Sequence, residues 1–358
     1  MSKLLCLLFV AMISTGSVFG QATIDRGEMK KGEADTLRFP EEKHLRNIRM
    51  LTFGGQNAEA YFSFNEKMLS YQAAFDDMKC DQIFIMNTDG GNRCMISTGR
   101  GRTTCSYFLP GDSELIYSST HLADSACPPP PDMSHGYVWK LYDTFDIFRV
   151  KIDGSGLTRL TASPGYDAEA TVSPRGDKIV FTSTRDGDPE IYTMKPDGTD
   201  QTRLTFEKGY DGGAFFSSDG SQIVFRASRP KTAKDSADYH ELVKDGLYRP
   251  TALEIYVMDA DGKNMRQVTS LGKASFAPYF FPDGKRIIFS SNANSASGRD
   301  FDLYIVNTDG TGLEQVTFNP TFDGFPMFTR DGKQLVFASN RFDRKPGETN
   351  IFMADWVD

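Results

Sequence analysis

The side chains best suited to contact a ligand or partner are two histidines, two arginines, three carboxylates and one tryptophan. They are His121, His135, Trp139, Glu169, Asp211, Arg226, Arg229 and Asp323. Guanidinium groups bind anions, imidazole titrates near neutral pH, and carboxylates accept protons or hold cations. These residue types can therefore form a polar binding site, provided that the fold brings them together.

The carboxylates recur at matching places in the chain. Aromatic-acidic pairs occur at Tyr166-Asp167, Tyr210-Asp211 and Phe322-Asp323, while Glu59 and Glu169 occupy another shared position. If the fold places these five carboxylates at one end of a central channel, the channel mouth, they can hold a cation or meet a basic partner. Because the pattern repeats, it favours the alternative in which each carboxylate satisfies backbone donors of a neighbouring loop.

His121 and Arg226 depart from the residues at equivalent positions. When the repeats of the chain are aligned, equivalent residues form columns. The column of His121, at the end of the second strand, otherwise contains Ala74, Arg185, Arg229, Ala293 and Arg341. Arg226 aligns with Tyr71, Ser118, Thr182, Ser290 and Ala338. The two exceptions can bind an anion or orient a polar ligand, and ordinary satisfied side chains are the alternative.

Cofactor and catalytic motifs are sparse in this sequence. His121, His135 and a mouth carboxylate have the chemistry to hold a divalent metal, although no close ligand spacing indicates one, and no cofactor is predicted. The sequence has no G-x-S-x-G, no H-E-x-x-H and no phosphate loop. This favours a binding module over an enzyme.

The first twenty residues resemble a cleavable signal peptide, with Lys3 before an apolar run and small residues at Val18 and Gly20. Residues 21–44 then form an N-terminal extension. A net charge of -8 argues against nucleic acid as the partner, and no later segment is apolar enough to span a membrane. We expect a periplasmic or secreted monomer that binds an envelope or secreted protein, or a glycan.

Four cysteines remain after the expected cleavage: Cys80, Cys94, Cys105 and Cys127. An exported protein can form disulfides. We predict a bond between Cys105 and Cys127, which would fix a proline-rich insertion to its own blade. Free buried thiols are the alternative.

The elements that position these residues form a sixfold repeat from residue 45 to 358. Each copy has a first strand ending in a tight turn, an apolar second strand, a third strand before Asp-Gly and a fourth ending in Thr. The first-strand turns read FSFNEK, FLPGD, VSPRGD, FSSDG, FPDG and FTRDG. Such register-matched copies predict an all-β, six-bladed propeller of four-stranded antiparallel blades.

The two ends of the chain are predicted to close the ring. The last third strand, NIFMADWVD, stops without its Asp-Gly turn, so the sixth blade lacks a fourth strand. Met50-Leu51-Thr52-Phe53 matches the fourth strands and precedes the first blade. An N-terminal strand should therefore complete the last blade.

Two insertions, at about 120–144 and 229–253, interrupt the connections between second and third strands. Antiparallel order places them on the same face as the crossovers between blades. We expect binding on this loop-rich face, with a short helix at 235–245 ended by Gly246. The alternative is that the insertions only cap the channel mouth.

The strand motifs IVFTSTR, EIYVM and DLYIV, with RLT endings, resemble those of the TolB-like propeller family over residues 45–358. The resemblance implies a periplasmic or secreted propeller that serves as a protein-interaction module. The leading hypothesis is a non-catalytic binding propeller. The runner-up is a carbohydrate- or peptide-processing enzyme using His121, Arg226 and Glu169, and a third is an accessory of an envelope complex.

Overall fold

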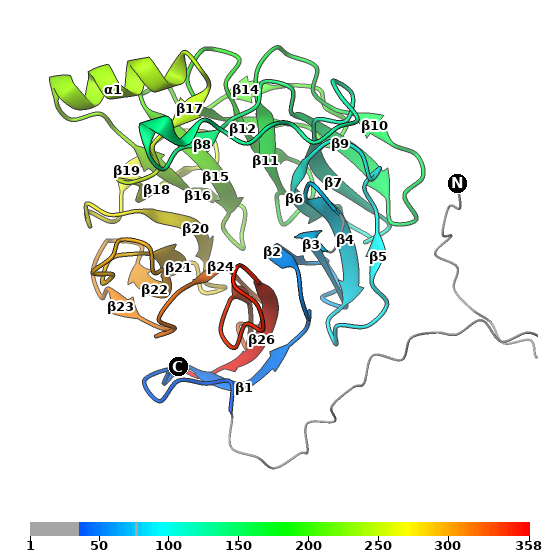
Figure 1. Cartoon of the computed structure of the whole chain (residues 1–358), viewed down its shortest axis with the longest axis vertical. Helices are drawn as coiled ribbons and strands as arrows, with labels where there is room; N and C mark the ends of the chain where they lie inside the picture. Colours follow the sequence, from blue (N-terminus) through cyan, green and yellow to red (C-terminus); the bar gives the residue numbers. More distant parts are fainter. Residues whose placement is uncertain (1–35, 76–77) are drawn as a thin grey trace, which may run out of the picture.

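The computed structural model describes residues 36–75 and 78–358, and its regular secondary structure consists almost entirely of β-strands. Six four-stranded antiparallel sheets surround a central axis (Figure 1). The first strand of each sheet lies innermost, where it packs against the first strands of its neighbours. The predicted six-bladed propeller is therefore confirmed. The predicted signal peptide, residues 1–20, and residues 21–35 of the extension lie outside the described residues.

The strands of each blade follow one another from the centre outward, except that the outer strand of blade six comes from the N-terminal side. Blades one to three consist of β2 (Gln56–Phe62), β3 (Met68–Ala74), β4 (Gln82–Asn87) and β5 (Cys94–Met95); β6 (Thr103–Phe108), β7 (Glu114–Ser119), β9 (Asp146–Lys151) and β10 (Thr158–Arg159); and β11 (Asp167–Val172), β12 (Ile179–Ser183), β13 (Glu190–Met194) and β14 (Thr202–Arg203). Blades four to six consist of β15 (Tyr210–Phe216), β16 (Gln222–Ser228), β18 (Glu254–Asp259) and β19 (Arg266–Gln267); β20 (Ser275–Phe280), β21 (Arg286–Ser291), β22 (Asp302–Asn307) and β23 (Glu314–Gln315); and β24 (Asp323–Phe328), β25 (Gln334–Ser339), β26 (Asn350–Trp356) and β1 (Leu45–Met50).

The hydrophobic core lies between the blades. In β12, Ile179 and Phe181 pack with residues of blade two, whereas Val180 packs with residues of blade four. Successive side chains of a strand point to opposite faces, so one apolar run supplies two cores. All three residues are fully buried. This explains why the second strands are continuously apolar instead of alternating with polar residues.

The ring closes as predicted, between β1 and β26. Leu45 pairs with Trp356 and Met50 with Phe352. Just after β1, the Thr52 hydroxyl donates to Asn350 Oδ1 at 3.0 Å. The sixth blade is thus held together by residues some 300 positions apart. Its outer strand, β1, directly precedes the first strand of blade one in the sequence.

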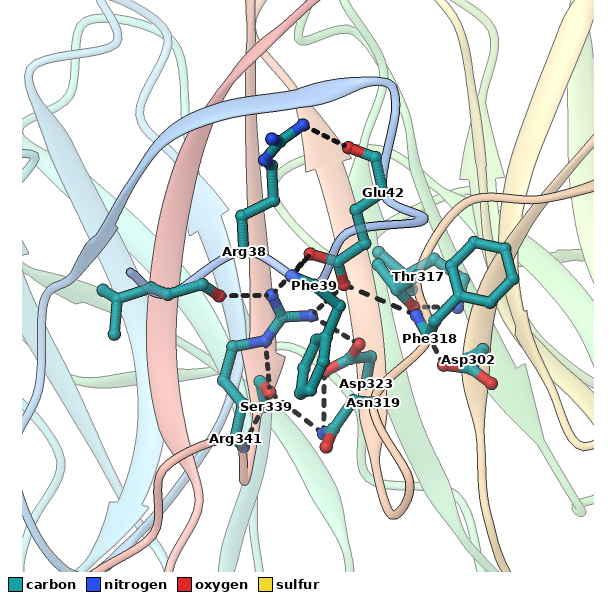
Figure 2. A network of polar contacts seen from close by, with 12 residues as sticks. Arg38, Phe39, Glu42, Asp302, Thr317, Phe318, Asn319, Asp323, Ser339 and Arg341 are labelled. Atoms are coloured by element: carbon teal, nitrogen blue, oxygen red, sulfur yellow. Dashed lines mark hydrogen bonds and ion pairs between the residues drawn. The ribbon is translucent and has the colours of Figure 1, made fainter. Parts of the chain in front are cut away.

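The segment before β1 makes a second set of contacts that stabilise blade six (Figure 2). Arg341, which is fully buried, donates to Glu42 Oε1 at 2.9 Å and to Asp323 Oδ2 at 2.7 Å. Its guanidinium also lies 5.4 Å from the Phe39 ring and 5.0 Å from the Phe337 ring. A buried guanidinium requires this degree of pairing, since an unpaired charge would be strongly destabilising.

The two insertions pack together on the loop-rich face. The short strands β8 (Trp139–Lys140) and β17 (Leu247–Tyr248) form a separate two-stranded sheet. A 3-10 helix, η1 (Met133–His135), and a helix, α1 (Ala233–Val243), complete them. The predicted helix is confirmed. It begins two residues earlier than expected, because Thr232 and Asp235 form a capping box at its start. Across the described ranges, no helix is long and apolar enough to cross a membrane.

The predicted disulfide between Cys105 and Cys127 is wrong. Cys127 is bonded to Cys80, which lies between the second and third strands of blade one, and Cys105 is a buried free thiol. Cys105 belongs to an innermost strand, whereas Cys127 lies on an insertion that reaches the neighbouring blade. The bond therefore joins two blades instead of fixing the insertion to its own.

Candidate functional site

A bulge interrupts the innermost strand of every blade at the same place. There the register between first and second strands shifts, and one residue adopts a left-handed backbone conformation. The six residues are Glu59, Cys105, Glu169, Gly213, Ala277 and Phe325, with φ between 43° and 62°. For non-glycine residues this conformation costs roughly 1–2 kcal/mol. Since the bulge recurs in all blades, it belongs to the fold, while the side chain it carries differs from blade to blade.

The bulge positions divide the centre of the propeller into two halves. Blades one to three contribute two carboxylates and a thiol, from Glu59, Cys105 and Glu169, whereas blades four to six contribute no polar side chain. Gly213 is required by its neighbour: a Cβ atom there would lie 1.9 Å from Arg226 Nη1. The guanidinium of Arg226 therefore fills the space that the glycine leaves.

Arg226 is the centre of a polar cluster with an aromatic wall. It forms an ion pair with Glu169 and donates to the Tyr210 hydroxyl at 2.7 Å. Its guanidinium also lies 5.2 Å from the ring of Trp139, which belongs to the short strand β8 of the first insertion. Glu169 accepts further hydrogen bonds from Thr182 Oγ1 at 2.7 Å and from the backbone of Gly213 at 2.9 Å. The structure thus brings together three predicted residues, Trp139, Glu169 and Arg226.

The second-strand column explains why Arg226 stands out. The strand pairing places Gln72, not Tyr71, in this column, which corrects our sequence alignment by one residue. Gln72, Thr182 and Ser290 each accept a hydrogen bond from the bulge N–H of the next blade. A guanidinium cannot accept a hydrogen bond. Arg226 instead reaches back to the preceding blade, so its departure from the column marks a different role.

Glu59 is the least satisfied member of the cluster. Its Oε2 is buried and has no hydrogen-bond partner among the described residues. Burial raises the pKa of Glu59 to about 7, with a hydrogen bond from Cys105 opposing the shift and the charge of Glu169 adding to it. Both protonation states are therefore populated at neutral pH. Burial likewise raises the pKa of the Cys105 thiol, so this cysteine is not an activated nucleophile.

Tyr210, Glu59 and Cys105 were not among our predicted binding residues. Glu59 was noticed in the repeat, but the bulge geometry that turns it and Cys105 toward Glu169 leaves no residue signature. Tyr210 was noticed only as the neighbour of Asp211. Its hydroxyl becomes significant through the contact with Arg226, which lies 16 positions away.

The predicted residues Asp211, Arg229 and Asp323 have partners within their own blades. Arg229 Nη1 lies 2.6 Å from Asp211 Oδ1, and Asp323 pairs with Arg341 as described above. Blade three has the same arrangement of aspartate and arginine. Burial raises the pKa of Asp211 to about 7 against the opposing charge of Arg229. These contacts indicate a structural role for the aspartates, through arginine side chains of the same blade instead of the backbone donors of a neighbouring loop that we predicted.

The two histidines lie away from this cluster. His121 occupies the arginine column: its Nδ1 is 2.9 Å from Ser119 Oγ, and its ring packs on Phe148 at 4.5 Å. Burial, with the charge of Arg100, lowers its pKa, so it is neutral at pH 7. His135 is exposed, and its carbonyl accepts a hydrogen bond from Arg249. In residues 36–75 and 78–358, no three His, Cys, Asp or Glu side chains are grouped to hold a metal ion.

A closed ring of six blades with a polar cluster at its centre defines the class, a six-bladed β-propeller. The TolB beta propeller domain family matches residues 137–242 and 248–356, more than half of the chain. The chain therefore belongs to this family.

Comparison with individual proteins adds detail to this assignment. The Tol-Pal system protein TolB of Bordetella pertussis strain Tohama I is 51% identical over 39 residues, which are 11% of this chain and 9% of that protein. The matched segment thus spans about a tenth of the curated relative. A putative TolB from Agrobacterium tumefaciens has a TM-score of 0.57 and 17% identity, covering 85% of this chain and 91% of that one. An oligogalacturonate lyase in complex with manganese has a TM-score of 0.51 and 15% identity, covering 87% and 93%. At these identities, the two structures show the shared fold alone.

Proposed function

We propose that this protein is an exported, non-catalytic binding propeller that engages an envelope or secreted protein through its loop-rich face. The observation that carries the proposal is the distribution of exposed apolar side chains. Six large ones lie on connections of this face: Phe53, Leu122, Met133, Tyr137, Phe206 and Phe342. Phe206 is 70% exposed and Tyr137 62%. Exposed aromatic residues gathered on one face are typical of protein interfaces.

The loop-rich face is also held in a fixed shape. The disulfide between Cys80 and Cys127 joins neighbouring blades, and the β8–β17 sheet joins the two insertions. Arg249, in the second insertion, donates to both carboxylate oxygens of Asp238 at 2.9 Å and to the carbonyl of His135 in the first. A preorganised surface loses less conformational entropy on binding, which favours recognition.

The relatives also support a protein-binding function, without specifying the partner. The Bordetella protein is named as a Tol-Pal system component, which supports an envelope location and a protein partner here. We propose a periplasmic or secreted location and a monomer that meets its partner at this face. An envelope glycan is the other ligand class for exposed aromatics.

The proposal is tested by capture experiments on envelope extracts. The double variant Tyr137→Ser/Phe206→Ser should capture at least ten times less of the partner than the wild-type protein. Both side chains are exposed and lie outside the hydrophobic core, so their loss should not unfold the protein. Leu313→Ser is the matched control, since Leu313 is 44% exposed and lies before β23 outside this face. Full retention of the partner by the double variant, or by a chain lacking both insertions, would exclude the loop-rich face.

The Glu59 cluster favours a second candidate, a carbohydrate- or peptide-processing enzyme. A carboxyl group with a pKa of about 7 beside a carboxylate and a guanidinium has the properties of a general acid or base. His121, which we expected in this role, does not contact Glu169 or Arg226. Turnover of oligogalacturonate or a peptide library that is lost in Glu59→Gln would favour the enzyme. No turnover by the wild-type protein would leave the binding propeller as the function.

A further inference from the structure

A cavity of about 410 Å³ opens on the face opposite the insertions. It lies where the first strands end and turn into the second strands, and all six blades contribute to it. Most of its lining is aromatic or aliphatic and includes Phe64, Tyr107, Phe215 and Tyr279. We call this cavity the turn-side funnel. Its volume and apolar walls are typical of sites for small organic ligands.

Aromatic side chains from opposite blades form the floor of the turn-side funnel. The Tyr61 ring, from blade one, packs edge-on against Phe215 of blade four at 5.4 Å. The Tyr107 ring, from blade two, also packs edge-on against Phe215, at 6.3 Å. Phe215 also contacts Tyr279 at 5.5 Å. This layer lies between the funnel and the bulge residues, so the funnel is distinct from the Glu59 cluster.

Two arginines from opposite blades, Arg175 and Arg330, stand at the rim. Arg330 stacks 5.1 Å from the Phe64 ring, and its guanidinium forms no hydrogen bond or ion pair with the described residues. The Arg175 side chain is 71% exposed, with Asp177 at 4.0 Å. The Glu66 carboxylate also lines the cavity; its Oε1 accepts the backbone N–H of Arg330, and it keeps its negative charge. Two guanidinium groups and one carboxylate give the lining one net positive charge, on a chain whose net charge is -8.

We propose that the turn-side funnel binds a carboxylate that carries an aromatic group, with the aromatic ring packed on the floor that Phe215 and Tyr279 form and the carboxylate on Arg330. A planar guanidinium matches a planar carboxylate through paired hydrogen bonds. Aromatic rings meet the edges and faces of Phe and Tyr favourably. The ligand is either a free aromatic acid or the C-terminal residue of a peptide, because both present the same two groups.

Calorimetric titration of the full chain tests the proposal with four probes. N-acetyl-phenylalanine and an acetylated hexapeptide ending in phenylalanine carry the carboxylate, while their C-terminal amides lack it. At least one acid should bind ten times more tightly than its amide. Tighter binding of the peptide acid indicates a peptide terminus as the source, and equal binding of both acids indicates a free acid.

Substitutions then assign the binding to the funnel. Arg330→Gln should weaken the acid about tenfold and leave the amide unchanged, whereas Arg299→Gln, an exposed arginine on the other face, should change neither. Tyr279→Leu should weaken acid and amide alike. Equal binding of acid and amide, no effect of Arg330→Gln, or no binding at millimolar concentration would overturn the proposal. None of these outcomes bears on the loop-rich face, whose variants are tested separately.

Discussion

Single residues decide the character of the central polar cluster. The ion pair between Arg226 and Glu169 is nearly buried, with side-chain exposures of 10% and 12%. Removing one partner of such a pair leaves the other charge buried and unpaired, which typically costs about 3–5 kcal/mol. Replacing both partners by neutral groups of similar size costs much less.

We therefore expect Glu169→Gln to lower the free energy of unfolding by about 3 kcal/mol. The double variant Glu169→Gln/Arg226→Met should recover most of that loss. Urea unfolding of the two single variants and the double variant measures the coupling between the residues. Additive losses in the double variant would show that the pair contributes no coupling energy.

Asp302 makes stability depend on pH. Burial raises its pKa to about 7, and the nearby charges of Asp323 and Glu42 add to the shift. An unfolded aspartate has a pKa of about 3.9. Between these values the unfolded chain releases its proton while the native protein retains it, so stability falls as the pH rises from about 4 to 7. The slope for one such group is at most about 1.4 kcal/mol per pH unit.

Asp302→Asn should reduce this decline, because the group no longer titrates. The test is urea unfolding at pH 5 and pH 8, comparing the change between the two pH values in each protein. Asp300→Asn is the control, since Asp300 is only partly buried and its pKa is lowered by hydrogen bonds from Ser295 and Ser297. An identical decline in wild type and Asp302→Asn would contradict the assignment.

At the residue level, the sequence singled out side chains that depart from their column. The structure places one of them, Arg226, in the central polar cluster and the other, His121, away from it. The role of Cys105 was not predictable, because no residue pattern signals a left-handed bulge at a cysteine. The alignment of Tyr71 with Arg226 was wrong by one residue, since Gln72 occupies that position. An error of one residue matters because it assigns every side chain of the strand to the opposite face.

At the scale of elements, the disulfide between Cys80 and Cys127 holds the first insertion. Closing a loop across a separation of 47 residues stabilises a fold by about 4 kcal/mol in the chain-entropy treatment. Cys127→Ala should therefore destabilise the protein by about 2–4 kcal/mol and expose residues 120–144 to protease. Cys105→Ala, which removes only a buried thiol, should leave that segment protected. Peptide mapping that found Cys105 bonded to Cys127 would refute the described bond.

The elements differ in how far the sequence determined them. The short turns and long insertions were predictable, because repeat positions locate every strand. The partner of Cys127 was not, since the repeat tells which face a loop lies on but not which neighbouring loop it reaches. The turn-side funnel was missed for a related reason: it is formed by short turns that look alike in every blade, and only their convergence produces a cavity.

For the whole molecule, closure of the ring is the dominant feature. A chain starting at Gly55 lacks β1 and the Glu42 contact to Arg341. It should unfold at a clearly lower temperature and with less cooperativity, because blade six then ends in an unpaired edge. A chain starting at Thr36, which retains both, is the control. Equal melting temperatures by circular dichroism would show that closure contributes little.

The fold as a whole was predictable because six weak copies of one pattern reinforce each other. Met50-Leu51-Thr52-Phe53 indicated closure by its likeness to other fourth strands, and the structure extends that strand back to Leu45. Glu42 gave no such signal, since its role depends on a buried arginine 299 positions away.

The pairing of β1 with β26 also sets the order of events during synthesis. β1 leaves the ribosome before any other strand described here, and its partner, β26, is the last of these strands to be made. Blades one to five can form as their strands emerge, whereas the sixth must wait for Asn350–Trp356. Contacts of such large sequence separation form slowly. Until then, β1 is an open edge available for wrong pairing, so chaperone dependence during synthesis should be greatest just before β26 emerges.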